Sequence, residues 1–207
     1  MRKIILTILV FVFQLLMCNY GQAQSRFDAT AFVGLNMIQI EGDGAGSYNH
    51  AGLRAGVGTS FALGSDSQSP WRMVVQLAFS NKGSYVEQYD RSLSVSYVEL
   101  PLLLSYNCLG NRLRVAAGVA PGVNVGANVT NSGVEDKLSE DNFTAMDWLP
   151  LTVSLGYRFT DHLGLEARYQ NSMASVTKEN GSGTYRVFRS NKGCFTRLMS
   201  FALTYTF

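Results

Sequence analysis

Met199-Ser200-Phe201-Ala202-Leu203-Thr204-Tyr205-Thr206-Phe207 closes the chain, and its side chains alternate between apolar and small or polar. Successive side chains of a β-strand point to opposite faces. One face of this segment therefore carries Phe195, Met199, Phe201, Leu203, Tyr205 and Phe207. The other face carries Thr196, Ser200, Ala202, Thr204 and Thr206, with Leu198 as the exception. A strand with one apolar and one small or polar face is typical of a barrel wall between lipid and a polar interior.

The first residues have the pattern of a secretory signal peptide. Residues 1–3 supply two positive charges, and residues 4–17 are almost entirely apolar. Gly21 and Ala23 place small residues where a signal peptidase requires them, which predicts cleavage before Gln24. The signal peptide predicts export, and together with the two-faced strand it predicts a protein of the bacterial outer membrane.

This interpretation divides the chain into a signal peptide at residues 1–23 and a β-barrel domain at residues 24–207. Two alternatives exist for the leader. An uncleaved anchor would need a longer apolar run to cross a membrane as a helix. A lipoprotein attached through Cys18 would need a residue smaller than Met17 before the cysteine.

The charge balance gives no sign of a nucleic-acid partner. The chain has 17 Lys and Arg and 15 Asp and Glu, so loss of Arg2 and Lys3 leaves 15 of each sign. No later segment approaches the roughly 18 unbroken apolar residues of a membrane-spanning helix. If the mature chain crosses a membrane, it must do so as a closed barrel, because only helices and closed barrels satisfy every backbone group in lipid.

Apolar alternation with period two recurs along the mature chain between clusters of Gly, Asn, Ser and Asp. The pattern predicts eight strands, at residues 27–38, 50–63, 71–80, 93–106, 112–125, 148–159, 163–171 and 195–207. Connections between them are alternately short and long, as in an outer-membrane barrel with periplasmic turns and longer extracellular loops. The predicted fold is all-β, an eight-stranded antiparallel up-and-down transmembrane barrel with both ends of the domain at the periplasmic side.

Two prolines interrupt this pattern. Pro101 lies inside the fourth predicted strand and has no N–H to donate, so we expect a bulge or a break there. Pro121 weakens the far end of the fifth strand for the same reason. Aromatic residues gather at the predicted periplasmic strand ends, where they favour the lipid–water boundary. They are Phe27, Trp71, Tyr106, Tyr157, Phe159, Tyr205 and Phe207.

Four stretches resemble the outer-membrane β-barrel proteins of Bacteroidetes, the porin-family or PorT-like barrels. They are residues 52–58 (GLRAGVG), 97–106 (YVELPLLLSY), 155–159 (LGYRF) and 203–207 (LTYTF), and the second is the most specific. The resemblance covers nearly the whole mature chain and implies a small antiparallel outer-membrane barrel. It implies no reaction. PorT itself is associated with type IX secretion, so an accessory role in such a system is one function to test.

The predicted lumen holds the best candidate site. Strand parity points charged residues of both signs inward: Asp28, Arg54, Arg72, Glu99, Arg114, Arg158, Glu166 and Arg168. Eight strands leave an interior just wide enough for side chains, and buried charges must pair or stay hydrated. We expect a structural ion-pair network, with Glu99 and Glu166 among arginines in mid-barrel and glycines making room for long side chains. A narrow anion-preferring path, or a small anion site, is the alternative.

Catalytic, metal and cofactor chemistry find little support in the sequence. Only His50 and His162 could serve as bases. His162 is predicted in a short turn on the side opposite to outer-leaflet substrates, and His50 has only Ser47 and Tyr48 near it, which make a weak catalytic set. The histidines and cysteines lack zinc spacing. The acidic loop with Glu135, Asp136, Glu140 and Asp141 lacks the ligand spacing of a calcium loop. The sequence therefore predicts a protein without enzymatic activity, metal or cofactor.

Two further hypotheses concern the loops and the thiols. Cys108 and Cys194 are predicted at opposite ends of the barrel, too far apart for a disulfide, so both should be free. The last long loop combines basic and aromatic residues: Lys178, Tyr185, Arg186, Phe188, Arg189, Lys192 and Phe195 at its end. It is either a solvated loop or a contact for lipopolysaccharide or a protein.

The sequence thus favours a small outer-membrane barrel with a side-chain-filled lumen and surface loops for envelope integrity or partner contact. Its expected partners are outer-membrane lipid, lipopolysaccharide and envelope or secretion proteins. A soluble ligand-binding barrel of the calycin type is a further alternative. That fold would need the apolar residues inside, whereas the faces rich in Gly and Arg suit the interior better.

Overall fold

The computed structural model describes residues 27–41, 48, 50–64, 69–86, 91–131, 134–136, 146–173, 175 and 195–207. The predicted signal peptide at residues 1–23 and most of the last long loop lie outside the described residues. The strand segments are β1 (Phe27–Glu41), β2 (His50–Ala62), β3 (Trp71–Val86), β4 (Arg91–Glu99), β5 (Leu102–Cys108), β6 (Leu113–Val119), β7 (Gly122–Asn131), β8 (Val134–Asp136), β9 (Met146–Asp147), β10 (Pro150–Arg158), β11 (Leu163–Ser172) and β12 (Phe195–Thr206).

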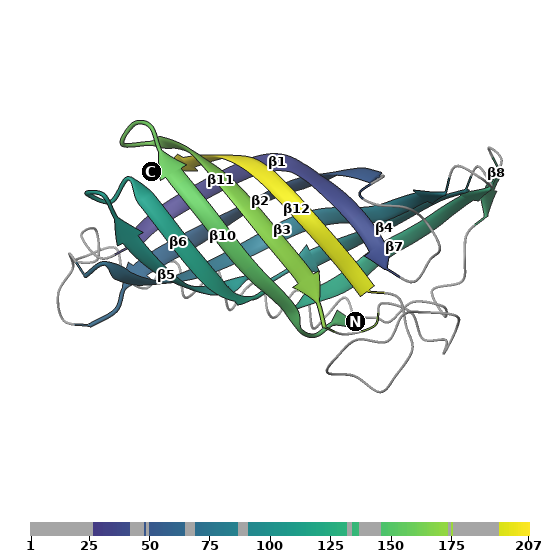
Figure 1. Ribbon diagram of the computed structural model, residues 1–207, viewed down its shortest axis with the longest axis horizontal. Helices are drawn as coiled ribbons and strands as arrows, with labels where there is room; N and C mark the ends of the chain where they lie inside the picture. Colours follow the sequence, from purple (N-terminus) through teal and green to yellow (C-terminus); the bar gives the residue numbers. More distant parts are fainter. Residues whose placement is uncertain are drawn as a thin grey trace.

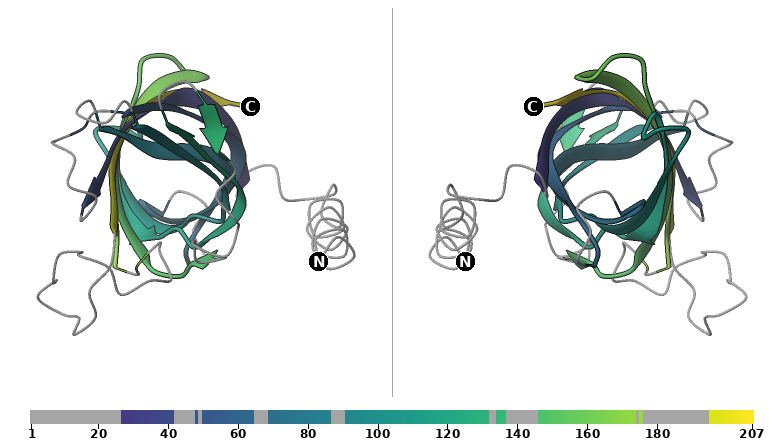
Figure 2. Two further views of the ribbon diagram at one scale, coloured as in Figure 1. Left: turned by 90° about the vertical axis from the view of Figure 1, so that its right-hand side faces the viewer. Right: turned by 90° about the vertical axis from the view of Figure 1, so that its left-hand side faces the viewer.

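These segments form a closed antiparallel barrel of eight strands, which confirms the predicted fold (Figure 1). Both β2 and β12 pair with β1, so the first and last strands of the barrel meet. Three of the eight barrel strands are each built from two segments in line: β4 with β5, β6 with β7, and β9 with β10. Figure 2 shows the ring formed by the strands from its two ends.

Prolines mark the interruptions within these strands. Pro101 separates β4 from β5, as expected, and Pro121 separates β6 from β7. Their carbonyl groups still accept hydrogen bonds from neighbouring strands, from Gln76 N to Pro101 O at 3.0 Å and from Leu100 N to Pro121 O at 2.8 Å. The prolines therefore remove a donor without opening the wall.

Buried and exposed side chains alternate along the barrel strands. As the sequence predicts, the small and polar residues face inward and the apolar residues face outward. In β10, Thr152 and Ser154 are buried, whereas Leu151 and Val153 are 46% and 52% exposed. A soluble barrel would show the opposite sidedness, so the exposed apolar band fits contact with lipid. Phe195 was expected on this band but is fully buried, although its register position is that of the lipid-facing residues.

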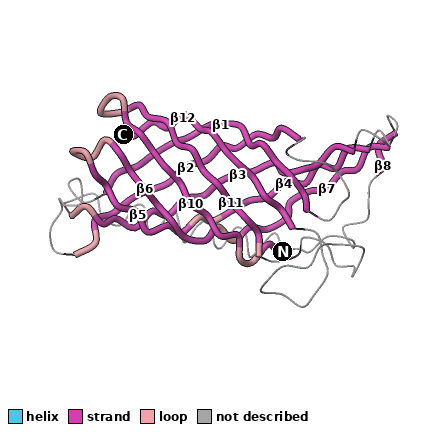
Figure 3. The backbone as a smooth tube through the Cα atoms, in the orientation of Figure 1, coloured by secondary structure: helices cyan, strands magenta, loops and turns pink. Residues whose placement is uncertain are grey.

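Aromatic rings form pairs at one end of the barrel. Ring centroids are 5.0 Å apart for Trp71 and Tyr106, and 5.0 Å apart for Tyr205 and Phe207. This is the end at which β1 begins and β12 ends, and the short turns at residues 109–112 and 159–162 lie there as well (Figure 3). We call it the short-turn end. The paired rings fit the boundary between lipid and water.

At the opposite end the sheet extends beyond the predicted strands. The third strand was expected to end at Ser80, but β3 continues to Val86 and pairs there with β4. The hairpin of β7 and β8 projects in the same direction (Figure 1). None of the described residues forms a helix of the length and apolar character that crossing a membrane requires.

Candidate functional site: the lumenal charge network

Glu166 of β11 lies at the centre of the barrel interior and contacts three arginines. Its carboxylate is 2.9 Å from Arg168 Nη2 and 3.2 Å from Arg54 Nη1. The Arg114 Nη2 atom lies 3.5 Å from its second oxygen. Gln76 completes this cluster, which we call the central layer, as its side-chain oxygen accepts hydrogen bonds from Arg168 at 2.6 Å and Arg54 at 3.3 Å.

The central layer joins opposite walls of the barrel. Gln76 lies on β3 and Arg168 lies on β11. In the closed ring these are the third and seventh barrel strands, four places apart in either direction. The hydrogen bond between the two side chains therefore crosses the full width of the lumen.

An aromatic ring and a glycine support the central layer. The Arg54 guanidinium lies 4.3 Å from the centroid of the Phe32 ring, a favourable cation–π arrangement. A Cβ atom at Gly56 would stand 2.6 Å from Cζ of that ring. Gly56 thus leaves room for Phe32, which in turn packs against Arg54. The sequence predicts that lumenal glycines make room for long side chains. Gly56 does so indirectly, because it makes room for the Phe32 ring and this ring packs against Arg54.

A second cluster, which we call the outer layer, lies nearer the end of the barrel opposite the short turns. Lys82 Nζ is 2.7 Å from the Glu99 carboxylate and 3.7 Å from that of Asp147, and all three side chains are buried. Gln170 donates to Glu99 at 3.0 Å, and Ser172 donates to Asp147 at 2.6 Å. The lysine ammonium also lies 4.7 Å from the centroid of the Tyr97 ring.

The outer layer corrects one expectation and adds two residues. Glu99 was expected to pair with arginines, but its ion-pair partner is Lys82. Strand parity gives the face of a residue and not its height along the barrel axis. Lys82 and Asp147 lie just outside the predicted strand limits, although Lys82 continues the inward series of Arg72 to Ser80.

The remaining predicted residues lie near the short-turn end. Arg72 forms an ion pair of 3.0 Å with Asp28 and donates to Ser60. Arg158 donates from Nε and Nη2 to the backbone carbonyl of Asn111, at 3.1 and 2.6 Å. Within the part of the chain that the structure describes, Arg158 has no carboxylate partner.

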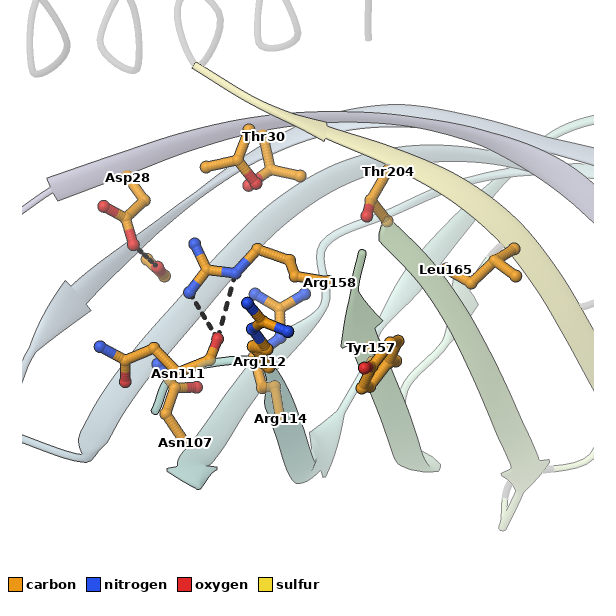
Figure 4. Close-up of a pocket in the computed structure, with 13 residues that line it drawn as sticks. Asp28, Thr30, Asn107, Asn111, Arg112, Arg114, Tyr157, Arg158, Leu165 and Thr204 are labelled. Atoms are coloured by element: carbon orange, nitrogen blue, oxygen red, sulfur yellow. Dashed lines mark hydrogen bonds between the residues drawn. The ribbon is translucent and has the colours of Figure 1, made fainter. Parts of the chain in front are cut away.

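A small pocket that is open to solvent lies near the short-turn end, and Arg114 links it to the central layer (Figure 4). We call it the vestibule. Its walls come from the ends of β1, β2, β5, β6, β10, β11 and β12 and from the turn at residues 109–112. Arg112, Arg114 and Arg158 line it together with Asp28. The vestibule was missed at the sequence level, because its shape depends on how turns and strand ends converge.

Several buried polar atoms of the network lack a hydrogen-bond partner among the described residues. They include Nε of Arg54, Nε and Nη1 of Arg168, and one carboxylate oxygen of Glu99. Burying charges costs several kcal/mol per ion, and only good geometry offsets this cost. The layers therefore fix the arrangement of the lumen more than they add net stability.

The candidate chemical residues outside the lumen have structural contacts. His162 Nδ1 lies 2.8 Å from the carbonyl oxygen of Thr206, and the ring stacks on Tyr205 at 5.6 Å. Cys108 is a free thiol, and Cys194 lies outside the described residues. No cluster of three or more His, Cys, Asp or Glu side chains suited to a metal occurs in the described ranges.

Comparison with known proteins gives the family. The sequence matches the outer membrane protein beta-barrel domain over residues 22–178. The chain belongs to this family. It is an outer-membrane β-barrel protein, and the short-turn end is therefore the periplasmic end by the general architecture of such barrels. No protein with a curated description matches the chain.

Several solved structures are similar to this chain. Ail, the attachment invasion locus protein of Yersinia pestis, is 12% identical with a TM-score of 0.51, over 88% of this chain and 99% of Ail. Ail in complex with the heparin analogue sucrose octasulfate is 10% identical with a TM-score of 0.52, over the same shares. Neisserial surface protein A is 10% identical with a TM-score of 0.42, over 88% of this chain and 97% of that protein.

Proposed function

We propose that this outer-membrane barrel is a closed, non-enzymatic scaffold that holds its extracellular segments for contact with the envelope or with a partner. The observation that carries the proposal is the hydrogen bond between Gln76 and Arg168, which joins opposite walls. The outer layer adds a second barrier, since Lys82 on β3 reaches both Glu99 on β4 and Asp147 on β9. Eight-stranded barrels leave little interior space beyond that which side chains fill.

Electrical recording in planar bilayers tests the closed lumen. The purified protein should insert without producing steady unitary currents. The double variant Gln76→Ala/Arg168→Ala removes the crossing contact and should raise the frequency of current events. Arg91→Gln, which removes one positive charge at the start of β4, toward the end of the barrel opposite the short turns, serves as the control. A steady current through the unmodified protein would contradict the proposal.

A narrow anion-preferring channel is the second candidate. The observation that favours it is the excess of guanidinium groups over carboxylates in the central layer, where Arg54, Arg114 and Arg168 surround Glu166. Such a channel would show a steady current, with a reversal potential in a chloride gradient that indicates anion preference. Absence of current in the same recordings removes this candidate.

The last long loop is the candidate for extracellular contact. Ail forms a complex with a sulfated heparin analogue, and the last loop of this chain is rich in Lys and Arg. We therefore infer that this loop contacts the anionic groups of lipopolysaccharide. Substitution of Lys178, Arg186, Arg189 and Lys192 by Gln should reduce lipopolysaccharide capture by the immobilised protein. Unchanged capture would remove lipopolysaccharide as the contact.

The resemblance to PorT-like barrels of Bacteroidetes suggests an accessory role in type IX-like secretion as a further possibility. It rests on the stretch at residues 97–106, which here supplies Tyr97 and Glu99 to the outer layer and Pro101 to the break between β4 and β5. Co-purification of secretion components after crosslinking in cells tests it. Export through a cleaved signal peptide is tested by mass spectrometry of the mature N-terminus, which should begin at Gln24.

A further inference from the structure

The vestibule carries more positive charge than its own carboxylates balance. Arg112, Arg114 and Arg158 line it, and Asp28 is the acidic residue among its lining residues. Asp28 is already paired with Arg72 at 3.0 Å. Glu166, which contacts Arg114 from above, is shared with two further arginines. Within the described chain, neither Arg112 nor Arg158 has an acidic partner.

The local structure holds one of these arginines in place. Leu109, Gly110 and Asn111 have φ angles of 51°, 63° and 65°, so three consecutive residues adopt the left-handed conformation. The carbonyl of Asn111 accepts two hydrogen bonds from Arg158, at Nε and Nη2. Figure 4 shows Arg158 beside Arg112 and Arg114, with its remaining guanidinium nitrogen turned away from Asn111. Arg158 is thus oriented by a neutral group that leaves its charge uncompensated.

Hydroxyl and amide groups complete the polar lining of the vestibule. Thr30, Ser60, Thr204 and Thr206 contribute hydroxyl groups, and Asn107 contributes an amide. Guanidinium groups match the planar pairs of oxygen atoms on phosphate, and hydroxyl and amide donors supply additional hydrogen bonds. A ligand here would enter from the periplasm and stop at the central layer.

We propose that the vestibule is a binding site for a phosphate-class oxyanion, held by Arg112, Arg114 and Arg158. The ligand is either free phosphate or the phosphoryl group of a lipid headgroup, because both present the same oxygen atoms. The site is distinct from the closed scaffold function and does not depend on it. A barrel that conducts and a barrel that is sealed could both hold an anion at this mouth.

Calorimetric titration of the protein in dodecyl maltoside with inorganic phosphate tests the site, with ionic strength held constant by chloride. We expect saturable binding to one site per barrel. Arg112→Gln and Arg158→Gln should each weaken binding about tenfold, since each removes a charged hydrogen-bond donor. The control Arg91→Gln removes a charge at the start of β4, toward the end of the barrel opposite the short turns, and should leave binding unchanged. Absence of saturable binding, or equal weakening by Arg91→Gln, would overturn the proposal.

Titration with glycerophosphoethanolamine distinguishes the two sources of the phosphoryl group. Binding of this phosphodiester as well as phosphate supports a site open to lipid headgroups, whereas binding of phosphate alone assigns the site to the free anion. Chemical modification provides a test that needs no variant. Phosphate should slow the reaction of Arg112 and Arg158 with phenylglyoxal, measured by peptide mass spectrometry. An unchanged rate at both residues would contradict the site.

Discussion

Arginine side chains serve different purposes in the central layer and in the vestibule. Arg54 and Arg168 of the central layer are buried and share the Glu166 carboxylate. Arg112 and Arg158 of the vestibule lie near solvent and have no carboxylate partner among the described residues. The comparison shows that an inward arginine becomes part of a seal where a carboxylate and an opposite wall are within reach. At the mouth, where they are not, it stays available for an external anion.

The largest effect is expected at the carboxylate of the central layer. Glu166→Gln leaves Arg54, Arg114 and Arg168 buried without their shared counter-charge. Removing one partner of a buried ionic cluster costs about 3–5 kcal/mol. Urea unfolding in lipid vesicles measures this change. The double variant Glu166→Gln/Arg168→Gln should recover part of the loss, and equal stability of the single variant and the natural protein would refute the central layer as described.

A smaller loss of stability is expected from substitution of Gly56, at which the backbone of β2 approaches the Phe32 ring. Gly56→Ala introduces a Cβ atom 2.6 Å from that ring and also against the backbone oxygen of Leu77. Overpacking of this kind costs about 1–3 kcal/mol. The matched control is Gly126→Ala, because a Cβ atom there meets no atom within 4 Å. Comparable unfolding midpoints for the two variants would show that the glycine makes no room for the ring.

The outer layer should tolerate loss of a carboxylate better than the central layer. In Glu99→Gln, Lys82 loses its partner at 2.7 Å but keeps Asp147 at 3.7 Å. We expect a loss of about 1–3 kcal/mol, with insertion into the membrane retained. Thermal unfolding in detergent measures it, and Glu135→Gln in β8 is the charge-matched control. An unchanged melting temperature would count against the pairing with Lys82.

The smallest effect is expected in the vestibule. Arg158→Gln removes hydrogen bonds to the Asn111 carbonyl from a partly exposed site, so the loss of stability should be below about 1 kcal/mol. Urea unfolding should show a clearly smaller loss of stability for Arg158→Gln than for Glu166→Gln. A loss as large as that of Glu166→Gln would show that the vestibule is also a structural seal, and the distinction between the two regions would fail.

The sequence predicts the sidedness of the barrel better than the contacts inside it. Alternation from Met199 to Phe207 shows which face meets lipid, because a strand with period two has only two faces. Pro101 predicts the break between β4 and β5, because it lacks a donor. Neither the alternation nor the position of the proline predicts the shear between neighbouring strands. This shear decides how high each inward residue lies along the barrel axis.

The partners of Glu99 and Glu166 show the consequence of this missing information. Both residues were assigned to the interior by parity, and both lie there. The register of β3 against β4 places Lys82 opposite Val95 and Glu99 opposite Ala78, so the long side chain of Lys82 has to reach along the barrel to Glu99. Only the closure of the ring brings Arg168 to Gln76. The vestibule depends in addition on the left-handed turn at residues 109–111, which the alternation of the flanking strands does not encode.

Nuclear magnetic resonance of the arginine side chains in lipid nanodiscs tests the central claim most directly. The Nη–H signals of Arg54 and Arg168 should be resolved and should persist after transfer to D₂O, because Nη1 and Nη2 of Arg54 and Nη2 of Arg168 bind Glu166 and Gln76 away from solvent. Those of Arg112 and Arg158 should exchange rapidly. Rapid exchange and averaged signals at Arg54 and Arg168 as well would contradict a lumen closed by the central layer.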